Sequence, residues 1–291
     1  MSARSLIPAD IQADARRLAA IALAEDGLRD LTTESVLPDA LAAVGRIEYR
    51  SAGVLAGTVY AAAVADAAGC RLRWQHGEGD VVAAHAVVGL LQGDMRNILR
   101  AERPLLNLLQ RAGGIAALTR RYVDAVDGTG CRILHTRKTA PGLRLLDVSA
   151  VLAGGGMRHR VDLSHEVMVK DNHWQMLAAQ GRTLGQAVER ARQLGATAVQ
   201  VEVESESQVE EACRAGADRL LVDNQRPETL ARWSELARKL HRGIEIEATG
   251  GITLENVRDY AIAGADYASI GALTHSVTAA DVAVEVDRDE R

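Results

Sequence analysis

The chain has 291 residues, 47% of them hydrophobic, and a formal charge of −5 at neutral pH. This composition allows one large domain or two ordinary ones, and the negative charge argues against nonspecific nucleic-acid binding. Its apolar runs are too short to span a bilayer and its first residues lack a signal-peptide core, so we expect a cytoplasmic protein. The cysteines lie far apart and predict neither disulfides nor a C-x-x-C metal site: Cys70, Cys131 and Cys213.

The N-terminal part mixes helical and strand-like patterns. One helical face collects the apolar residues of the first segment: Ile11, Ala15, Leu18 and Ala22. Between residues 45 and 88, strands are predicted in GRIEYR, AGVLAGTVYA, RLRWQ and VVAAHAVV. A long helix follows over about 94–126, with a predicted interruption at Gly113-Gly114. This part is therefore expected to be α+β.

Short apolar strands alternating with helical patterns fill the rest of the chain: CRILHT, EVMVK, AVQVEVE, RLLVDN, IEIEAT and YASIG. The last four are centred near 201, 221, 246 and 269, which leaves room for one helix between neighbouring strands. Helices are predicted over 205–215, 227–240 and 253–263. Right-handed β/α units in a parallel sheet have this spacing, so we predict a parallel β/α barrel or an open version of one.

Charged residues and glycines stand at the carboxyl ends of these strands: Arg137, Lys138, Lys170, Glu202, Asp223, Thr249, Gly250, Gly251 and Gly271. Taken singly, each is better explained as a solvated loop residue or a helix cap. Because the carboxyl ends of barrel strands converge at one mouth, the whole set predicts a single site there.

The acidic and glycine residues suggest two ligands. Thr249-Gly250-Gly251 precedes a helix predicted to open near Thr253, so backbone N–H groups and the helix dipole can face a phosphate. Glu202 and Asp223 can hold a hydrated Mg²⁺ or bond the hydroxyls of a sugar. The alternative for Glu202 is a core carboxylate paired with a lysine.

The basic residues suggest a second anion. Between residues 132 and 171, seven Arg and Lys outnumber four Asp and Glu. More cationic donors are present than one monophosphate needs, which predicts a polyanionic acceptor: Arg137, Lys138, His159, Arg160 and Lys170. The triple glycine 154–156 lets the backbone turn and present His159 and Arg160, unless it is an ordinary flexible loop. No tight histidine spacing predicts zinc.

At TRKTAPGLR, GGGMRHR, VKDNH, VEVES, LVDN, ATGGITLENV and SIGALTHS the sequence resembles quinolinate phosphoribosyltransferase, also called nicotinate-nucleotide pyrophosphorylase (carboxylating). The resemblance extends upstream through EDGLRDLTTE and ERPLLNLLQRAGGIA. It implies an N-terminal α/β sandwich over 1–112, to which a tail over 276–291 returns, and an open catalytic barrel of fewer than eight strands over 113–275. It also implies a homodimer, in which the sandwich of one subunit covers the barrel mouth of the other.

The implied reaction joins quinolinate to phosphoribosyl pyrophosphate, giving nicotinate mononucleotide, pyrophosphate and CO₂ in de novo NAD biosynthesis, with Mg²⁺ and no organic cofactor. By motif matching, Arg103 enters the partner's site. Quinolinate and nearby phosphates are bound by Arg137, Lys138, His159, Arg160 and Lys170. The ribose and Mg²⁺ contact Glu202 and Asp223, which with Lys138 form the expected catalytic set. The 5-phosphate is held by Thr249, Gly250, Gly251 and Gly271.

The chain departs from the family pattern at four positions. His135 stands where the family has Asp, Val148 where it has Lys, Gln200 where it has Glu, and Thr249 where it has Ser. The first two put the electrostatics near the substrate in question, whereas Thr249 keeps a hydroxyl.

Three other functions stay open at this point. The nearest is a related pyrophosphorylase-like protein associated with molybdenum transport. A nicotinate phosphoribosyltransferase without decarboxylation would leave several cations without a partner, which is costly when they are buried. A nucleotide-sensing protein would keep the pocket but not the turnover.

Overall fold

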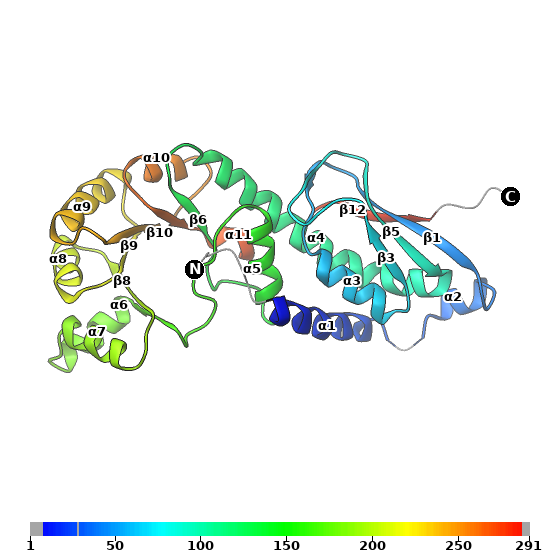
Figure 1. The fold of residues 1–291 in the computed structure, drawn as a ribbon, viewed down its shortest axis with the longest axis horizontal. Helices are drawn as coiled ribbons and strands as arrows, with labels where there is room; N and C mark the ends of the chain where they lie inside the picture. The colour runs from blue at the N-terminus through cyan, green and yellow to red at the C-terminus, as the bar shows by residue number, and fades with distance from the viewer. Residues whose placement is uncertain (1–7, 28, 287–291) are drawn as a thin grey trace. The chain divides into compact units, whose positions relative to one another are not determined.

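The computed structural model describes residues 8–27 and 29–286 (Figure 1). The chain forms two compact units, the first made of residues 1–120, 139–156 and 272–291, and the second of residues 121–138 and 157–271. Compared with the expected 1–112 and tail 276–291, the first unit also includes residues 113–120, 139–156 and 272–275. In the described part of the chain, no helix is both long enough and apolar enough to cross a membrane.

The first unit is an antiparallel sheet with helices. Its sheet has the order β12-β1-β5-β3, and the C-terminal strand β12 pairs along β1. From Gly45 to Tyr49, every second residue of β1 is buried, including Ile47, so one face of the sheet forms the core. Its elements are α1 (Pro8–Glu25), α2 (Leu31–Val36), β1 (Ala42–Tyr49), β2 (Gly53–Val54), α3 (Thr58–Ala67), β3 (Arg71–Trp74), β4 (Val81–Val82), β5 (Ala86–Asp94), most of α4 (Met95–Ala125), α5 (Arg144–Ala153), α11 (Ala272–His275) and β12 (Val282–Val286). The predicted α/β sandwich is confirmed.

Two local predictions in this unit are wrong. Helix α4 runs through Gly113-Gly114 without a break. A Cβ atom on Gly114 would lie 2.2 Å from the carbonyl oxygen of Thr278, so the glycine allows close packing and does not end the helix.

The predicted strand AGVLAGTVYA is a strand only at its start and is helical at its end. Only Gly53–Val54 forms a strand, and α3 begins at Thr58. The carboxylate of Glu78, twenty residues away, accepts the N–H groups of Gly57 and Thr58 at 2.8 and 2.9 Å. A distant side chain therefore caps this helix, and no local sequence signal marks its start.

The second unit is the predicted open β/α barrel. Its strands, as far as the structure describes them, form one six-stranded parallel sheet in the order β6-β11-β10-β9-β8-β7. One side of the strands is fully apolar and buried, as at Val201, Leu220 and Ile246, whereas the other side carries charged residues. The elements are β6 (Arg132–Leu134), β7 (Glu166–Val169), α6 (Asp171–Ala179), α7 (Leu184–Gln193), β8 (Ala198–Val203), α8 (Glu206–Ala215), β9 (Arg219–Asp223), α9 (Pro227–Leu240), β10 (Glu245–Thr249), α10 (Val257–Ile262) and β11 (Tyr267–Ser269).

The helix ends in this unit follow their sequence signals with one exception. Ser205 caps α8, and Gly216 closes it with a φ of 78°. Helix α10 begins at Val257 rather than near Thr253, because Asn256 accepts the Thr253 N–H at 2.8 Å and donates to the Gly251 carbonyl at 3.0 Å. This closed turn delays the helix, so the prediction of a helix dipole starting at Thr253 is wrong.

Candidate active site

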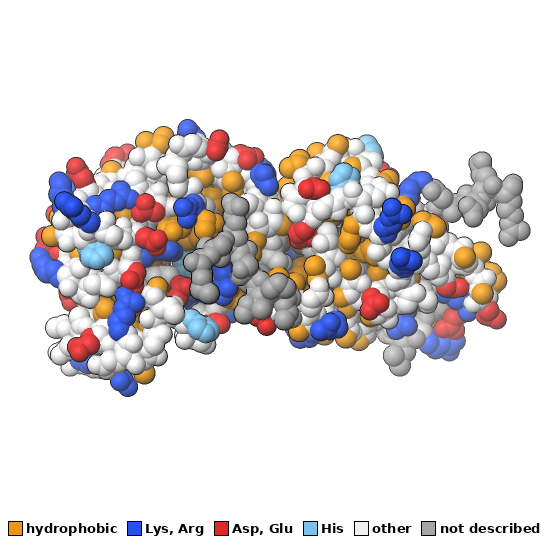
Figure 2. Space-filling view, viewed as in Figure 1, with side chains coloured by type: hydrophobic (Ala, Val, Ile, Leu, Met, Phe, Trp, Pro, Cys, Tyr) orange, Lys and Arg blue, Asp and Glu red, His pale blue; other side chains and the backbone are white. Residues whose placement is uncertain are grey.

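A cavity of about 770 Å³ lies at the carboxyl ends of the parallel strands. All of its lining residues belong to the second unit: His135, Thr136, Arg137, Lys138, His159, Arg160, Met168, Lys170, Asp171, Glu202, Glu204, Leu221, Asp223, Asn224, Glu247, Thr249, Gly250, Gly251 and Ser269. In the view of Figure 2, acidic, basic and histidine side chains are interspersed over this unit. The strand ends thus bring together most of the residues that the sequence singled out.

The acidic side of the cavity is formed by Glu202 and Asp223 on neighbouring strands. Lys170 Nζ lies 2.6 Å from Glu202 Oε2, so this carboxylate does pair with a lysine, but at the cavity rather than in the core. Burial raises the pKa of Asp223, and the negative charge of Glu202 raises it further. Because the Glu202 charge disfavours a second negative charge on Asp223, a cation bound between them would be stabilised.

The cationic side is formed by Arg137, Lys138 and Arg160. Burial and the nearby Arg137 charge lower the pKa of Arg160. Among the described residues, the buried Nε atom of Arg137 has no hydrogen-bond partner. A bound anion would relieve the repulsion between these cations and would accept the buried Arg137 N–H. This side of the cavity is therefore suited to an anion.

A glycine turn closes the third side. Gly250 and Gly251 have φ values of 78° and 62°, a region that side chains other than glycine rarely adopt. A Cβ atom on Gly250 would lie 2.2 Å from Asn224 Oδ1, and the Asn224 N–H donates to the Thr249 carbonyl at 2.9 Å. The turn is therefore packed tightly against the end of β9, and only glycine fits there.

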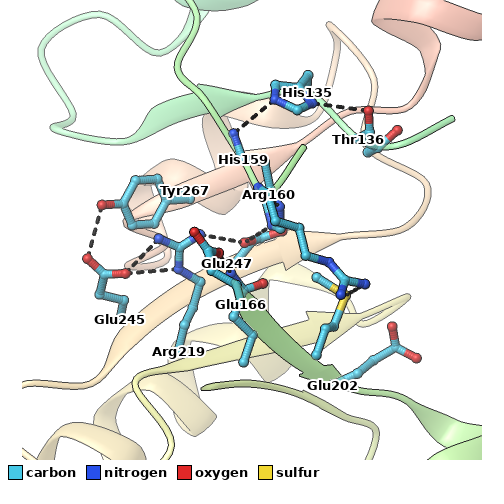
Figure 3. A network of polar contacts seen from close by, with 12 residues as sticks. His135, Thr136, His159, Arg160, Glu166, Glu202, Arg219, Glu245, Glu247 and Tyr267 are labelled. Carbon is cyan, nitrogen blue, oxygen red and sulfur yellow. Dashed lines mark hydrogen bonds and ion pairs between the residues drawn. The ribbon is translucent and has the colours of Figure 1, made fainter. Parts of the chain in front are cut away.

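A polar network that begins at the cavity residues His159 and Glu247 fills the inner side of the strands (Figure 3). His159 Nε2 lies 3.2 Å from the carboxylate of Glu247, and Arg219 donates to Glu247 at 3.0 Å and to Glu245 at 2.7 Å. Burial alone raises the pKa of Glu247, but His159 and Arg219 beside it lower that pKa to about 2. Tyr267 completes the network by donating to Glu245 at 3.0 Å.

Sequence reasoning did not assign a role to this network. The only signal for it is the alternation IEIE in β10, which places two carboxylates on the inner side of a strand whose outer side is apolar. A strand covered on both faces normally reads as a continuous apolar run, so these glutamates are the anomaly that could have revealed it.

Two predicted site residues do not line the cavity. Gly271 follows β11 just beyond Ser269, which does line it. Arg103 is exposed on α4 in the first unit. Of the departures from the family pattern, only His135 and Thr249 line the cavity, whereas Val148 is fully buried in the first unit and Gln200 donates to Glu166 at 2.8 Å.

The carboxylates of the cavity bear on metal binding. Within the described residues, no three His, Cys, Asp or Glu side chains gather to hold a metal ion by themselves. Glu202 and Asp223 nevertheless fit Mg²⁺, which commonly takes one or two carboxylates together with substrate phosphates and water.

An open β/α barrel with cations, carboxylates and a glycine turn around its mouth defines the class of the chain: a barrel enzyme that binds small polyanions. Residues 30–113 match the N-terminal domain of quinolinate phosphoribosyl transferase, and residues 115–285 match its C-terminal domain. The chain therefore belongs to the quinolinate phosphoribosyltransferase family, and the resemblance stated from its motifs is confirmed.

Individual relatives agree with this assignment. The chain is 37% identical to a probable nicotinate-nucleotide pyrophosphorylase (carboxylating) of Methanothermobacter thermautotrophicus, over 90% of this chain and 95% of that protein. It is also 37% identical to the human nicotinate-nucleotide pyrophosphorylase (carboxylating), over 81% and 80% of the two chains. The solved structure of nicotinate-nucleotide pyrophosphorylase from Francisella tularensis superposes with a TM-score of 0.89 at 29% identity, covering 99% of both chains.

Proposed function

We propose that the chain transfers the phosphoribosyl group of phosphoribosyl pyrophosphate to quinolinate and releases CO₂ and pyrophosphate, giving nicotinate mononucleotide for NAD synthesis. Family membership supports the reaction. The observation that carries it in this chain is the convergence of cations, carboxylates and a glycine turn on one cavity of about 770 Å³. A phosphorylated sugar and a pyridine dicarboxylate need all three groups at once.

The cationic side binds the two carboxylates of quinolinate. Arg137 and Arg160 offer planar forks that match a carboxylate, and Lys138 and Lys170 add point charges beside them. Both ring nitrogens of His159 are already bonded, Nε2 to Glu247 and Nδ1 to the Arg160 N–H at 2.7 Å. Its contribution to binding is therefore its shape rather than a spare hydrogen-bond donor.

The acidic side meets the ribose and the metal. Loss of pyrophosphate leaves a cation-like ribosyl centre, which the carboxylates of Glu202 and Asp223 stabilise. The same two residues would hold Mg²⁺, which when bound neutralises charge on the pyrophosphate leaving group. Thr249, Gly250 and Gly251 offer backbone N–H groups to the 5-phosphate, together with Gly271 at the end of the adjoining strand.

Positioning matters more here than a protein base. The pyridine nitrogen is itself the nucleophile, so the protein needs to hold it in line with the ribosyl carbon. Once the nitrogen is quaternary, the ring accepts the electron pair left when the C2 carboxylate departs as CO₂. Lys138 lines the cavity beside Arg137, which supports a role in holding that carboxylate during transfer.

The test is substrate choice. Purified protein is incubated with Mg²⁺, phosphoribosyl pyrophosphate and either quinolinate or nicotinate, and nicotinate mononucleotide is measured. We expect product from quinolinate and its loss in Lys138→Ala, with exposed Lys239→Ala as the matched control that keeps activity. Product from nicotinate alone would move the assignment to the simpler transferase, and no product from either would favour the molybdenum-associated or sensing function.

We further propose a homodimer in which Arg103 of one subunit completes the site of its partner. The exposure of Arg103 on α4 supports this proposal. Mixing two inactive variants tests whether the site is shared. Arg103→Ala and Lys138→Ala are each expected to be inactive. In a hybrid of the two, one site regains both residues, so mixing should restore about a quarter of the wild-type activity. No recovery in verified hybrids would place Arg103 outside the partner's site.

A cytoplasmic location is also part of the proposal.

A further inference from the structure

The segment that leads to Arg160 is held beside β6. The Met157 N–H donates to the Ile133 carbonyl at 2.7 Å, as in a parallel sheet. Past the end of β6, the His159 N–H donates to Nε2 of the His135 imidazole at 3.1 Å. A side chain thus takes the place of a main-chain carbonyl at the point where this segment enters the cavity.

The tautomer of His135 follows from its second contact. Its Nδ1 lies 3.1 Å from the carbonyl oxygen of Thr136, which can only accept, so Nδ1 carries the proton and Nε2 is left as an acceptor. The ring is fully buried, and burial lowers the pKa of His135 to about 4. At neutral pH the imidazole is therefore a neutral acceptor.

The other contacts of this segment fix the orientation of Arg160. His159 is bonded through both ring nitrogens, to Glu247 and to the Arg160 N–H. The guanidinium of Arg160 then lies in the cavity, with Nη2 3.3 Å from Met168 Sδ (Figure 3). The direction of Arg160 depends on the backbone at residue 159, and His135 holds that backbone.

We infer that His135 is a positioning residue: its Nε2 accepts the His159 amide and so aims the Arg160 guanidinium at a carboxylate of the substrate. The inference rests on the proposed function for the identity of that carboxylate. The aspartate that the family pattern has at this position would also accept the amide, but it would add a negative charge close to Arg158 and Arg160. Histidine keeps the acceptor and leaves the positive charge of the pocket undiminished for a dianionic substrate.

Steady-state kinetics on His135→Leu and His135→Gln separate positioning from packing. Leucine fills similar space without an acceptor, whereas the amide oxygen of glutamine reaches about as far as Nε2. We expect His135→Leu to raise KM for quinolinate about tenfold while KM for phosphoribosyl pyrophosphate stays within about twofold, and His135→Gln to restore quinolinate binding. Equal losses in both variants, or equal changes in both KM values, would overturn the inference.

A double-mutant cycle shows whether the effect passes through Arg160. Arg160→Lys removes the guanidinium that His135 positions. In that background, His135→Leu should raise KM for quinolinate little further. Additive effects of the two substitutions would mean that His135 acts on something else.

A measurement that needs no turnover keeps the inference separate from the proposed function. The ¹⁵N chemical shifts of the His135 ring, recorded on the wild-type protein at neutral pH, report its tautomer. Protonated Nδ1 with unprotonated Nε2 is the expected state, whether or not quinolinate is the substrate. A ring protonated at Nε2 cannot accept the His159 amide and would overturn the inference, whereas failure of wild-type turnover with this tautomer intact would overturn only the proposed function.

Discussion

Each of the two units contains an ion pair with a buried carboxylate. The two pairs differ in how many hydrogen bonds the protein itself supplies to that carboxylate. In the first unit, Arg111 contacts both oxygens of Asp147 at 2.7 Å, and Asp147 also accepts the Ala140 N–H. In the second unit, Lys170 contacts one oxygen of Glu202 at 2.6 Å, and the lysine is 45% exposed at the cavity. A saturated pair, whose carboxylate oxygens are both hydrogen-bonded within the protein, stabilises the structure. An unsaturated pair, which lies beside a cavity and uses only one oxygen, can exchange partners with a ligand.

The largest effect on stability is expected at the saturated pair. Asp147→Asn leaves the guanidinium of Arg111 without its countercharge in the first unit, and should lower the free energy of unfolding by about 3 kcal/mol. Urea unfolding measures this, with Glu210→Gln, which breaks the exposed pair with Arg214, as the control that changes little. If the two variants unfold alike, the Arg111–Asp147 pair is not structural.

At the unsaturated pair, the effect should fall on catalysis. Lys170→Ala removes a cation from the cavity and is expected to lower kcat/KM for quinolinate about a hundredfold, with little change in urea unfolding. Measuring both quantities on the same preparation sharpens the contrast with Asp147→Asn. A loss of stability as large as the one at Asp147 would erase the distinction between the pairs.

A third prediction concerns the acid limit of stability. The pKa of Glu247 is lowered from 4.5 to about 2, so its contribution to stability is present above pH 4.5 and is lost as the pH falls towards 2. Glu247→Gln should therefore cost about 2 kcal/mol at neutral pH. The difference between variant and wild type should shrink in acid. Unfolding curves at several pH values test this, and a constant difference would contradict the ion-pair network.

The smallest change in stability is expected at Asp223. Because its pKa is raised by burial and by Glu202, its contribution to stability is present at low pH and is lost as the pH rises through the raised pKa. At neutral pH, Asp223→Asn should have a Tm equal to or slightly above that of the wild type. Its activity should be lost. Thermal unfolding with a parallel assay checks it. A clear drop in Tm would mean that Asp223 is held for structure.

How far the sequence predicted the structure depends on whether the signal is local. The strands of the barrel and helix α9 lie where their apolar runs and Pro227 indicated, because β/α units repeat their signals along the chain. The start of α3 was missed because its cap, Glu78, is distant in sequence. The start of α10 was misplaced because Asn256 closes a turn that resembles a helix start.

The cavity was predictable for a related reason. Its charged residues stand at strand ends, and parallel topology alone brings strand ends together. The polar network around Glu247 was not predicted, since the contact of His159 with Glu247 joins residues 88 positions apart and depends on which side of β10 faces inward. The role of His135 was equally hidden, because its contact depends on the tautomer of a buried ring.

The most direct test of the central claim is the release of CO₂ from quinolinate labelled at its C2 carboxylate, measured together with nicotinate mononucleotide. We predict one CO₂ for each nucleotide formed, loss of both in Lys138→Ala, and retention of both in Asp147→Asn at a temperature where that variant is folded. Nucleotide without labelled CO₂, or a Lys138→Ala variant as active as wild type, would contradict a decarboxylating transfer at the mouth of this barrel.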